Sequence, residues 1–227
     1  MTGPATTGRD ALGVPGPTQP SSAGVRLLAR VIFAVTGLIS AVSLVVDGVQ
    51  TARLYGAGRP LQDYFSYFTV QSNIIVVVCC VVLVADPARD GRIWRVIRLD
   101  SLLCIAVTGL VYVTVLRGDS HPQGSFYWTN IGLHYVTPTL VVVGWLLVGP
   151  RPRISWLTIP WALIYPLLWL AYTLIRGAQL QWYPYPFIDV TAHGYGQVAV
   201  NCLAVTVLFV VLGLVLRLLD RALPAVP

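Results

Sequence analysis

Apolar residues gather along this chain into six long runs, at about residues 27–47, 65–85, 96–116, 128–148, 156–175 and 194–216. A helix needs roughly 20 mainly apolar residues to cross about 30 Å of hydrocarbon, and each run reaches that length. Barrel strands cross in about 10 residues of alternating character, so runs of this length indicate helices. The pattern predicts an all-α polytopic membrane protein, a bundle of six transmembrane helices.

Composition supports this interpretation, because 56% of the 227 residues are hydrophobic and only 11% are charged. Residues 1–24 are rich in Gly, Pro, Ser and Thr and lack the apolar core of a signal peptide. We therefore expect a disordered cytoplasmic tail at 1–24, a six-helix transmembrane domain at 25–218 and a short cytoplasmic tail at 219–227. No stretch is left for a soluble catalytic domain.

The charge distribution predicts the orientation in the membrane. All 15 basic residues are arginines. Eleven flank the runs on one side, namely Arg9, Arg26, Arg30, Arg89, Arg92, Arg95, Arg98, Arg151, Arg153, Arg217 and Arg221. The other four are Arg53, Arg59, Arg117 and Arg176. The positive-inside rule then predicts a multi-pass protein of the cell membrane with both termini in the cytoplasm. The arginines form no stripe with exposed aromatic residues, so we expect no nucleic-acid partner.

Signatures of several other site classes are absent from the sequence. There is no phosphate-binding glycine loop, no HExxH and no CxxC motif, and the three histidines are scattered along the chain. Cys79, Cys80, Cys104 and Cys202 all fall within predicted spans, where we expect them to pack rather than form disulfides or bind zinc. We expect neither a cofactor nor a metal.

Polar residues enter three of the predicted spans from the outer side, spaced three or four apart and so on one helical face. These are Ser66, Thr69 and Asn73; Asn130, His134 and Thr137; and His193, Gln197 and Asn201. Turned inward, the three stripes would line one polar pocket open to the outer leaflet. The alternative is that these side chains only join helices, where such contacts contribute about 0.6 kcal/mol each.

Thr69 and His134 could together perform nucleophilic catalysis. A hydroxyl nucleophile needs a base within hydrogen-bond reach, and a neutral imidazole is the usual one. Asn73, one turn from Thr69, or Asn130, one turn from His134, could orient the imidazole or donate to an oxyanion. We expect His193, Gln197 and Asn201 to contribute to substrate binding in the same pocket.

The segment 181–189 is aromatic and rich in proline, and it lies at the predicted outer interface. It could belong to the belt of Trp and Tyr that anchors membrane proteins. Alternatively, because proline fixes the backbone, it could be a rigid lid that places Trp182 and Tyr185 over the pocket and against substrate.

Several short motifs follow one order along the chain: Tyr67-Phe68-Thr69, then Trp128, Asn130, His134 and Pro138, then Trp169, Tyr172, Gly177 and the 182–187 segment. Because these motifs occur in this order, the chain resembles the androgen-induced membrane hydrolase family. The resemblance implies six spans and hydrolysis of fatty acid esters of hydroxy fatty acids by a threonine and a histidine. These two residues fall on Thr69 and His134.

The leading hypothesis is thus a lipid ester hydrolase that acts from the outer leaflet, with membrane lipids and a fatty acyl ester as its partners. Two alternatives remain open. One is a non-catalytic membrane protein that binds lipid or a protein partner, and the other is a small-molecule transporter.

Overall fold

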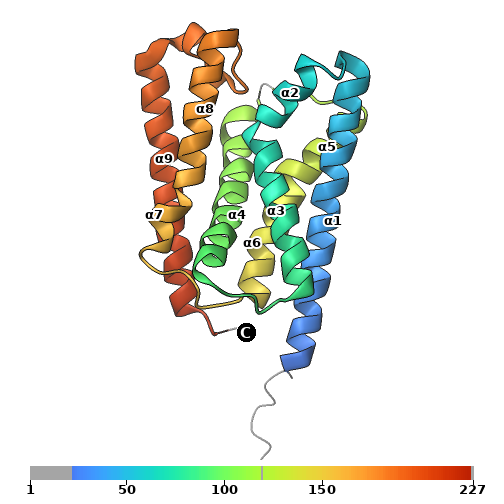
Figure 1. Cartoon of the computed structure of the whole chain (residues 1–227), viewed down its shortest axis with the longest axis vertical. Helices are drawn as coiled ribbons and strands as arrows, with labels where there is room; N and C mark the ends of the chain where they lie inside the picture. Colours follow the sequence, from blue (N-terminus) through green and yellow to red (C-terminus); the bar gives the residue numbers. More distant parts are fainter. Residues whose placement is uncertain (1–21, 119, 226–227) are drawn as a thin grey trace, which may run out of the picture.

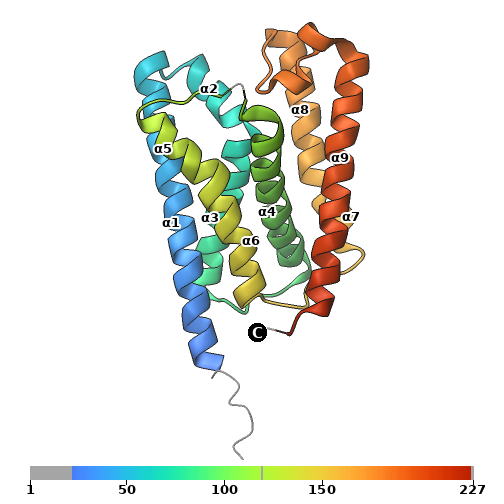
Figure 2. The ribbon, with the colours of Figure 1, turned by 180° about the vertical axis from the view of Figure 1, so that it is seen from behind.

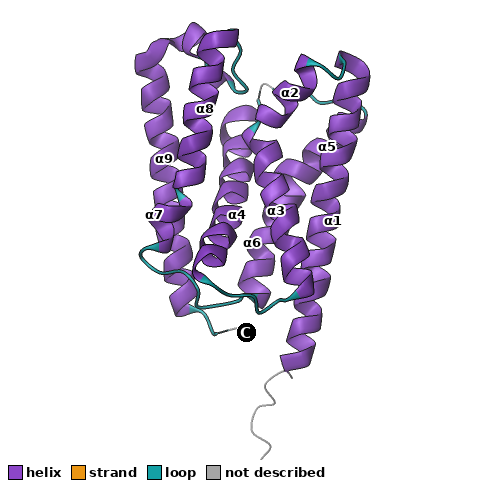
Figure 3. Ribbon diagram, in the orientation of Figure 1, coloured by secondary structure: helices purple, strands orange, loops and turns teal. Residues whose placement is uncertain are grey.

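A computed structural model describes residues 22–118 and 120–225, and every element within them is a helix (Figures 1 and 3). Six helical segments are long and apolar enough to cross a membrane. The predicted all-α polytopic bundle is therefore confirmed, and the chain is an integral membrane protein.

The elements follow one another in a simple up-and-down order. The spans are α1 (Ser22–Tyr55), α3 (Phe68–Ala85), α4 (Arg92–Val111) continued by the π-helical turn η1 (Tyr112–Leu116), α5 (Ser125–Ile131) continued by η2 (Gly132–Val136) and α6 (Thr137–Val148), α7 (Thr158–Ala162) followed by α8 (Ile164–Leu180), and α9 (Val190–Ala222). Two short elements, α2 (Arg59–Ser66) and the 3-10 turn η3 (Pro186–Ile188), lie between spans.

The ends of the first and last spans differ from the expected boundaries. The α1 helix already begins at Ser22, and α9 runs to Ala222, so residues 219–222 are helical. Pro224 explains where α9 stops, because proline disfavours helical geometry in the residue before it. The rest of the predicted N-terminal tail lies outside the described residues.

The helices form two groups (Figures 1 and 2). In the first, α1 packs against α3 and against α5 and α6, while α4 packs against α3 and α6. The second group, α7, α8 and α9, adjoins the first mainly through contacts of α7 and α9 with α4. The α4 helix is thus central, and Leu102, Leu103, Cys104 and Ile105 on it are almost completely buried.

The two ends of the bundle differ. The first residues of α1 and the last residues of α9 lie at one end, called here the terminal end (Figure 1). The α2 helix lies at the opposite end, with the segment 181–189, so we call it the α2 end. Apart from Arg9, outside the described residues, the larger group of arginines lies at the terminal end, while the orientation across the membrane stays a prediction.

Polar contacts join α1, α3 and η2 inside the first group. The Ser40 hydroxyl on α1 donates to Asn73 Oδ1 on α3 at 2.9 Å, and Asn73 Nδ2 donates to the Leu133 carbonyl on η2 at 3.4 Å. A Cβ on Gly132 would lie 2.1 Å from Ser43 Oγ and 3.1 Å from Ser43 Cβ, so a larger residue would require Ser43 or η2 to move. These contacts fix η2 beside the start of α3.

Candidate functional site

The break between α2 and α3 places Thr69 at the start of a helix. Tyr67 adopts an extended conformation, with φ −66° and ψ 132°, and α3 begins at Phe68. Backbone N–H groups in the first turn of a helix have no partner within it and point toward its positive end. Thr69 therefore combines a side-chain hydroxyl with a local environment that favours negative charge, and it is 7% exposed.

The π-helical turn η2 contains His134. Such turns interrupt α-helices, often at functional sites. The ring Nδ1 lies 3.3 Å from the backbone carbonyl of Asn130, one turn earlier. Because a carbonyl only accepts hydrogen bonds, Nδ1 carries the proton in this arrangement, and Nε2 is left as the acceptor.

The structure brings Thr69 and His134 together. Thr69 Oγ1 lies 3.1 Å from His134 Nε2, within the reach required of a nucleophile and its general base. Given the tautomer above, the threonine hydroxyl donates and the imidazole accepts. Among the described residues, the partner of the second ring nitrogen is a backbone carbonyl, not a carboxylate.

Tyr185, from the segment 181–189, completes this contact. Its hydroxyl accepts a hydrogen bond from the Thr69 backbone N–H at 3.1 Å and lies 3.3 Å from Thr69 Oγ1. Burial raises the pKa of Tyr185 to about 12, so the phenol keeps its proton at neutral pH. That proton is available to a negative oxygen beside Thr69.

Tyr112 and Asn130 hold the imidazole from the other side. The Tyr112 ring stacks on the His134 ring with centroids 4.1 Å apart and planes inclined by 26°. Asn130 Nδ2 donates to the Tyr112 hydroxyl at 2.7 Å. Asn130 thus accepts from His134 through its backbone carbonyl and donates to Tyr112 through its side-chain amide. The first contact fixes the tautomer of the imidazole, and the stacked Tyr112 ring fixes its plane.

The segment 181–189 is fastened to the helices around it. Arg176 forms an ion pair with Asp63 on α2, and its guanidinium lies 5.0 Å from the centre of the Trp182 ring. A Cβ on Gly177 would lie 2.0 Å from the Tyr183 ring, so glycine is needed for this segment to fold back on α8. Trp182 also packs edge-on against Tyr67. The aromatic segment is therefore a fixed cover over the start of α3.

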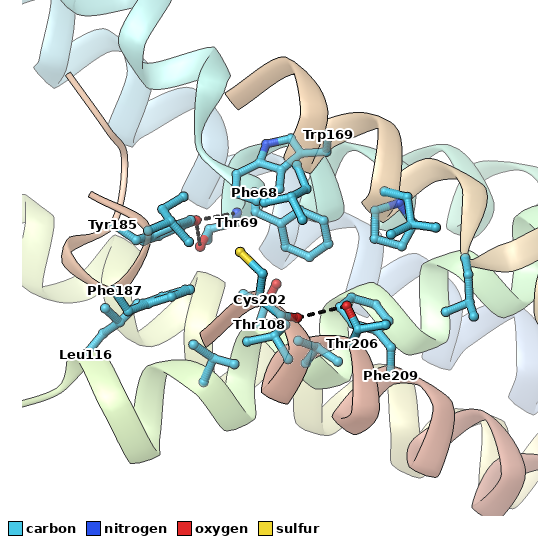
Figure 4. A pocket seen from close by; sticks show the side chains of 18 residues that line it. Phe68, Thr69, Thr108, Leu116, Trp169, Tyr185, Phe187, Cys202, Thr206 and Phe209 are labelled. Atoms are coloured by element: carbon cyan, nitrogen blue, oxygen red, sulfur yellow. Dashed lines mark hydrogen bonds between the residues drawn. The ribbon is translucent and has the colours of Figure 1, made fainter. Parts of the chain in front are cut away.

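Two different spaces meet at Thr69. The first is an apolar cavity between α3, α4, α8 and α9, lined mainly by aliphatic and aromatic side chains. Figure 4 shows Phe68, Trp169 and Phe209 around it, with Thr69 and Tyr185 joined at one end. The second is a wider hollow at the α2 end, which we call the vestibule. It is more polar than the first, because Asp47, Asp63, His121, Asn130 and His134 line it beside aromatic and aliphatic side chains. Thr69, Tyr185 and Leu116 line both spaces.

The remaining predicted residues make no hydrogen bond to the Thr69 hydroxyl or to the His134 ring. Asn73 is completely buried and bonded to Ser40, the Thr69 carbonyl and the Leu133 carbonyl, and so joins helices. The α9 stripe of His193, Gln197 and Asn201 lines a separate hollow beside Pro186 and Phe187. Asn201 Nδ2 donates to the Phe187 carbonyl at 2.7 Å, which links this stripe to the aromatic cover. Of the three stripes that were expected to meet, only the one with Thr69 and the one with His134 do so. Tyr185 contacts Thr69 where the α9 stripe was expected.

Sequence reasoning missed Tyr112 and the direct contact of Tyr185 with Thr69. Tyr112 is a polar-tipped residue in an otherwise apolar run near the predicted outer end of its span, which was a usable signal. No local signal shows that the Tyr185 hydroxyl reaches Thr69, because the two residues are 116 positions apart.

All four cysteines are free thiols. Among the described residues, no three His, Cys or Asp side chains are grouped so as to hold a metal ion. Scans against protein-family models, curated proteins and solved structures found no match to this chain.

Proposed function

We propose that this protein is a membrane-embedded hydrolase of fatty acyl esters, with Thr69 as nucleophile and His134 as general base. The observation that carries the proposal is the 3.1 Å contact between Thr69 Oγ1 and His134 Nε2 where an apolar cavity meets a polar vestibule. The resemblance to the androgen-induced membrane hydrolase family selects the same two residues.

The first half of the reaction forms an acyl-enzyme. As Thr69 Oγ1 attacks the ester carbonyl carbon, its proton passes to His134 Nε2. The carbonyl oxygen becomes an oxyanion beside the Tyr185 hydroxyl and the first turn of α3, both of which favour negative charge there. When the tetrahedral intermediate collapses, the alkoxy group leaves with the proton held by His134.

The second half releases the fatty acid. A water molecule from the vestibule gives its proton to His134 Nε2 and attacks the acyl carbon bound to Thr69. Collapse of this intermediate breaks the bond to Thr69 Oγ1, which regains the proton from His134. One ester and one water thus yield one alcohol and one carboxylic acid.

The two adjoining spaces suit an ester with one long apolar chain. An acyl chain would lie in the apolar cavity among Phe68, Trp169 and Phe209, where it loses contact with water. The alcohol portion would lie in the vestibule, where polar side chains and water are accessible. The scissile carbonyl then falls between them, next to Thr69.

The positive-inside rule supports a vestibule that faces outward, because it favours the arginine-rich terminal end in the cytoplasm. Substrate would then come from membrane lipids of the outer leaflet. Labelling in intact cells tests this orientation. Cysteines introduced at the α2 end of the protein should be accessible to a reagent that does not cross the membrane, and cysteines introduced at the terminal end should not.

A non-catalytic lipid carrier or binder is the alternative, because the apolar cavity would hold an acyl chain without any reaction. In that case substitution of Thr69 or His134 should leave lipid binding unchanged, and the purified protein should hydrolyse nothing.

The test uses the full chain in detergent, with a fluorophosphonate probe and with medium-chain p-nitrophenyl esters. We expect wild type and Thr69→Ser to be labelled and to hydrolyse the ester. Thr69→Ala and His134→Ala should lose at least about 100-fold in rate, because each removes a reacting group.

Thr114→Ala is the matched control, since Thr114 is exposed and bonds only to the carbonyl of Leu110 among the described residues. It should behave as wild type. A folded wild type that neither reacts with the probe nor hydrolyses esters of any chain length overturns the proposed function.

A further inference from the structure

A second polar pocket lies at the terminal end, far along the bundle from Thr69. We call it the arginine pocket. It is lined by Arg89, Asp90, Trp94, Arg95, Arg98 and Arg153, together with apolar residues such as Trp145. These residues come from the start of α4, the turn before it, the end of α6 and the segment that follows α6. Four guanidinium groups therefore surround a space that holds a single carboxylate.

Asp90 engages two of the four arginines. Its carboxylate accepts two hydrogen bonds from Arg95, at 2.6 and 2.7 Å, and lies 3.3 Å from Arg153 Nη1. The hydrogen bonds from Arg95 hold the pKa of Asp90 below its usual range, so it is a full anion. The carboxylate of Asp220 on α9 does not pair with a guanidinium among the described residues. It accepts hydrogen bonds from the backbone N–H groups of Arg153 and Ile154.

Several buried donors in the pocket have no acceptor among the described residues. These are the Trp94 indole N–H, Nε and Nη2 of Arg98, and Nε of Arg153. A buried donor without a partner destabilises the folded protein, and does so more when it is charged. Three residues of one pocket share this deficit, which an acceptor in the pocket would remove.

Arg98 is the most isolated cation of the group. Its guanidinium lies 5.2 Å from the centre of the Phe33 ring, and no carboxylate pairs with it among the described residues. By contrast, Arg89 and Asp90 are exposed. The pocket thus opens to the surroundings at Arg89 and has its unpaired charge deeper inside.

We propose that the arginine pocket binds a phosphate group, carried by an anionic phospholipid or free in solution. Guanidinium groups recognise phosphate oxygens through paired N–H donors, which fits the unpartnered Nε and Nη2 of Arg98. The α4 helix begins at Arg92, so its N-terminal turn adds a favourable dipole. The proposal is independent of any chemistry at Thr69, which lies at the other end of the bundle.

The test measures binding to the purified full chain in a neutral detergent, by native mass spectrometry and by the shift in melting temperature. The probes are phosphatidylglycerol, phosphatidylcholine and inorganic phosphate. We expect phosphatidylglycerol to bind at least about ten times more tightly than phosphatidylcholine, whose choline group carries a positive charge toward four arginines.

Variants connect this preference to the pocket. Arg98→Gln should weaken binding of phosphatidylglycerol at least about tenfold, whereas Arg92→Gln, an exposed arginine on the same helix that does not line the pocket, should change it less than about twofold. Asp90→Asn should strengthen binding, because it frees Arg95 and Arg153 from their internal carboxylate.

The arms of the experiment also separate the two sources of phosphate. Stabilisation by inorganic phosphate that Arg98→Gln abolishes identifies the free anion, and a response to phosphatidylglycerol alone identifies a lipid headgroup. Equal binding of both lipids with no response to phosphate overturns the proposal. If Arg98→Gln fails to fold, weaker binding in the Asp90→Asn protein also overturns it.

Discussion

The hydroxyl of Tyr185 lies within 3.3 Å of both the backbone nitrogen and the side-chain oxygen of Thr69. Two segments 116 residues apart therefore meet at the atom proposed to attack substrate. Because Thr69 Oγ1 donates to His134, the proton of the phenol is directed toward Thr69 Oγ1 itself. The aromatic cover thus forms part of the site as well as closing it.

Tyr185→Phe tests this role, because it removes the hydroxyl and keeps the ring. Loss of one donor to an oxyanion commonly lowers kcat about 100- to 1000-fold. We expect a fall in kcat of that order with KM little changed, measured on the ester substrate. An unchanged kcat would show that the tyrosine only packs, as would a rise in KM alone.

The stability of the protein should depend on pH through the same phenol. Burial raises the pKa of Tyr185 to about 12 from an ordinary value near 10, so folding favours the protonated form. This contribution is fully present below pH 10 and is lost as pH rises toward 12, by up to about 1.4 kcal/mol per pH unit. Melting temperatures between pH 9 and 12 should therefore fall more steeply in wild type than in Tyr185→Phe. Parallel curves would contradict the assignment.

Asn73→Ala should reduce stability without a separate effect on chemistry. The variant removes the side-chain donor to the Leu133 carbonyl and leaves the Ser40 hydroxyl only its longer bond to the backbone carbonyl of residue 73, at a cost of about 1–3 kcal/mol in the free energy of unfolding. Unfolding in mixed micelles of sodium dodecyl sulfate measures the loss. At a temperature where the variant is fully folded, its kcat should match wild type, and a large fall there would instead place Asn73 in the reaction.

Arg176→Ala should loosen the aromatic cover. The change removes the ion pair with Asp63 and the contact with the Trp182 ring, both of which hold the 181–189 segment. Backbone hydrogen exchange across this segment should become faster, and KM should rise because the cover no longer shapes the site. Arg53→Ala is the control, since Arg53 is an exposed arginine near the end of α1 and makes no ion pair among the described residues. Equal effects of the two variants would contradict a specific role for Arg176.

The spans could be predicted because each depends on a local property, the length of an apolar run. Thr69 and His134 could be named for a related reason: helical periodicity reports which polar residues share a face. Periodicity does not report which faces meet. The α9 stripe had the same spacing as the other two, yet Gln197 and Asn201 line a different hollow.

The sequence by itself determined six membrane-spanning helices and a short set of polar residues that share helical faces near one end. Only the tertiary structure decided that α3 and η2 face each other, that Tyr185 joins them and that Asn73 serves as a tie between helices. The physical reason is that hydrophobicity and helical period act within one segment. Hydrogen bonds between segments depend instead on how closely two helices approach, as η2 approaches α1 where Gly132, which has no side chain, meets Ser43.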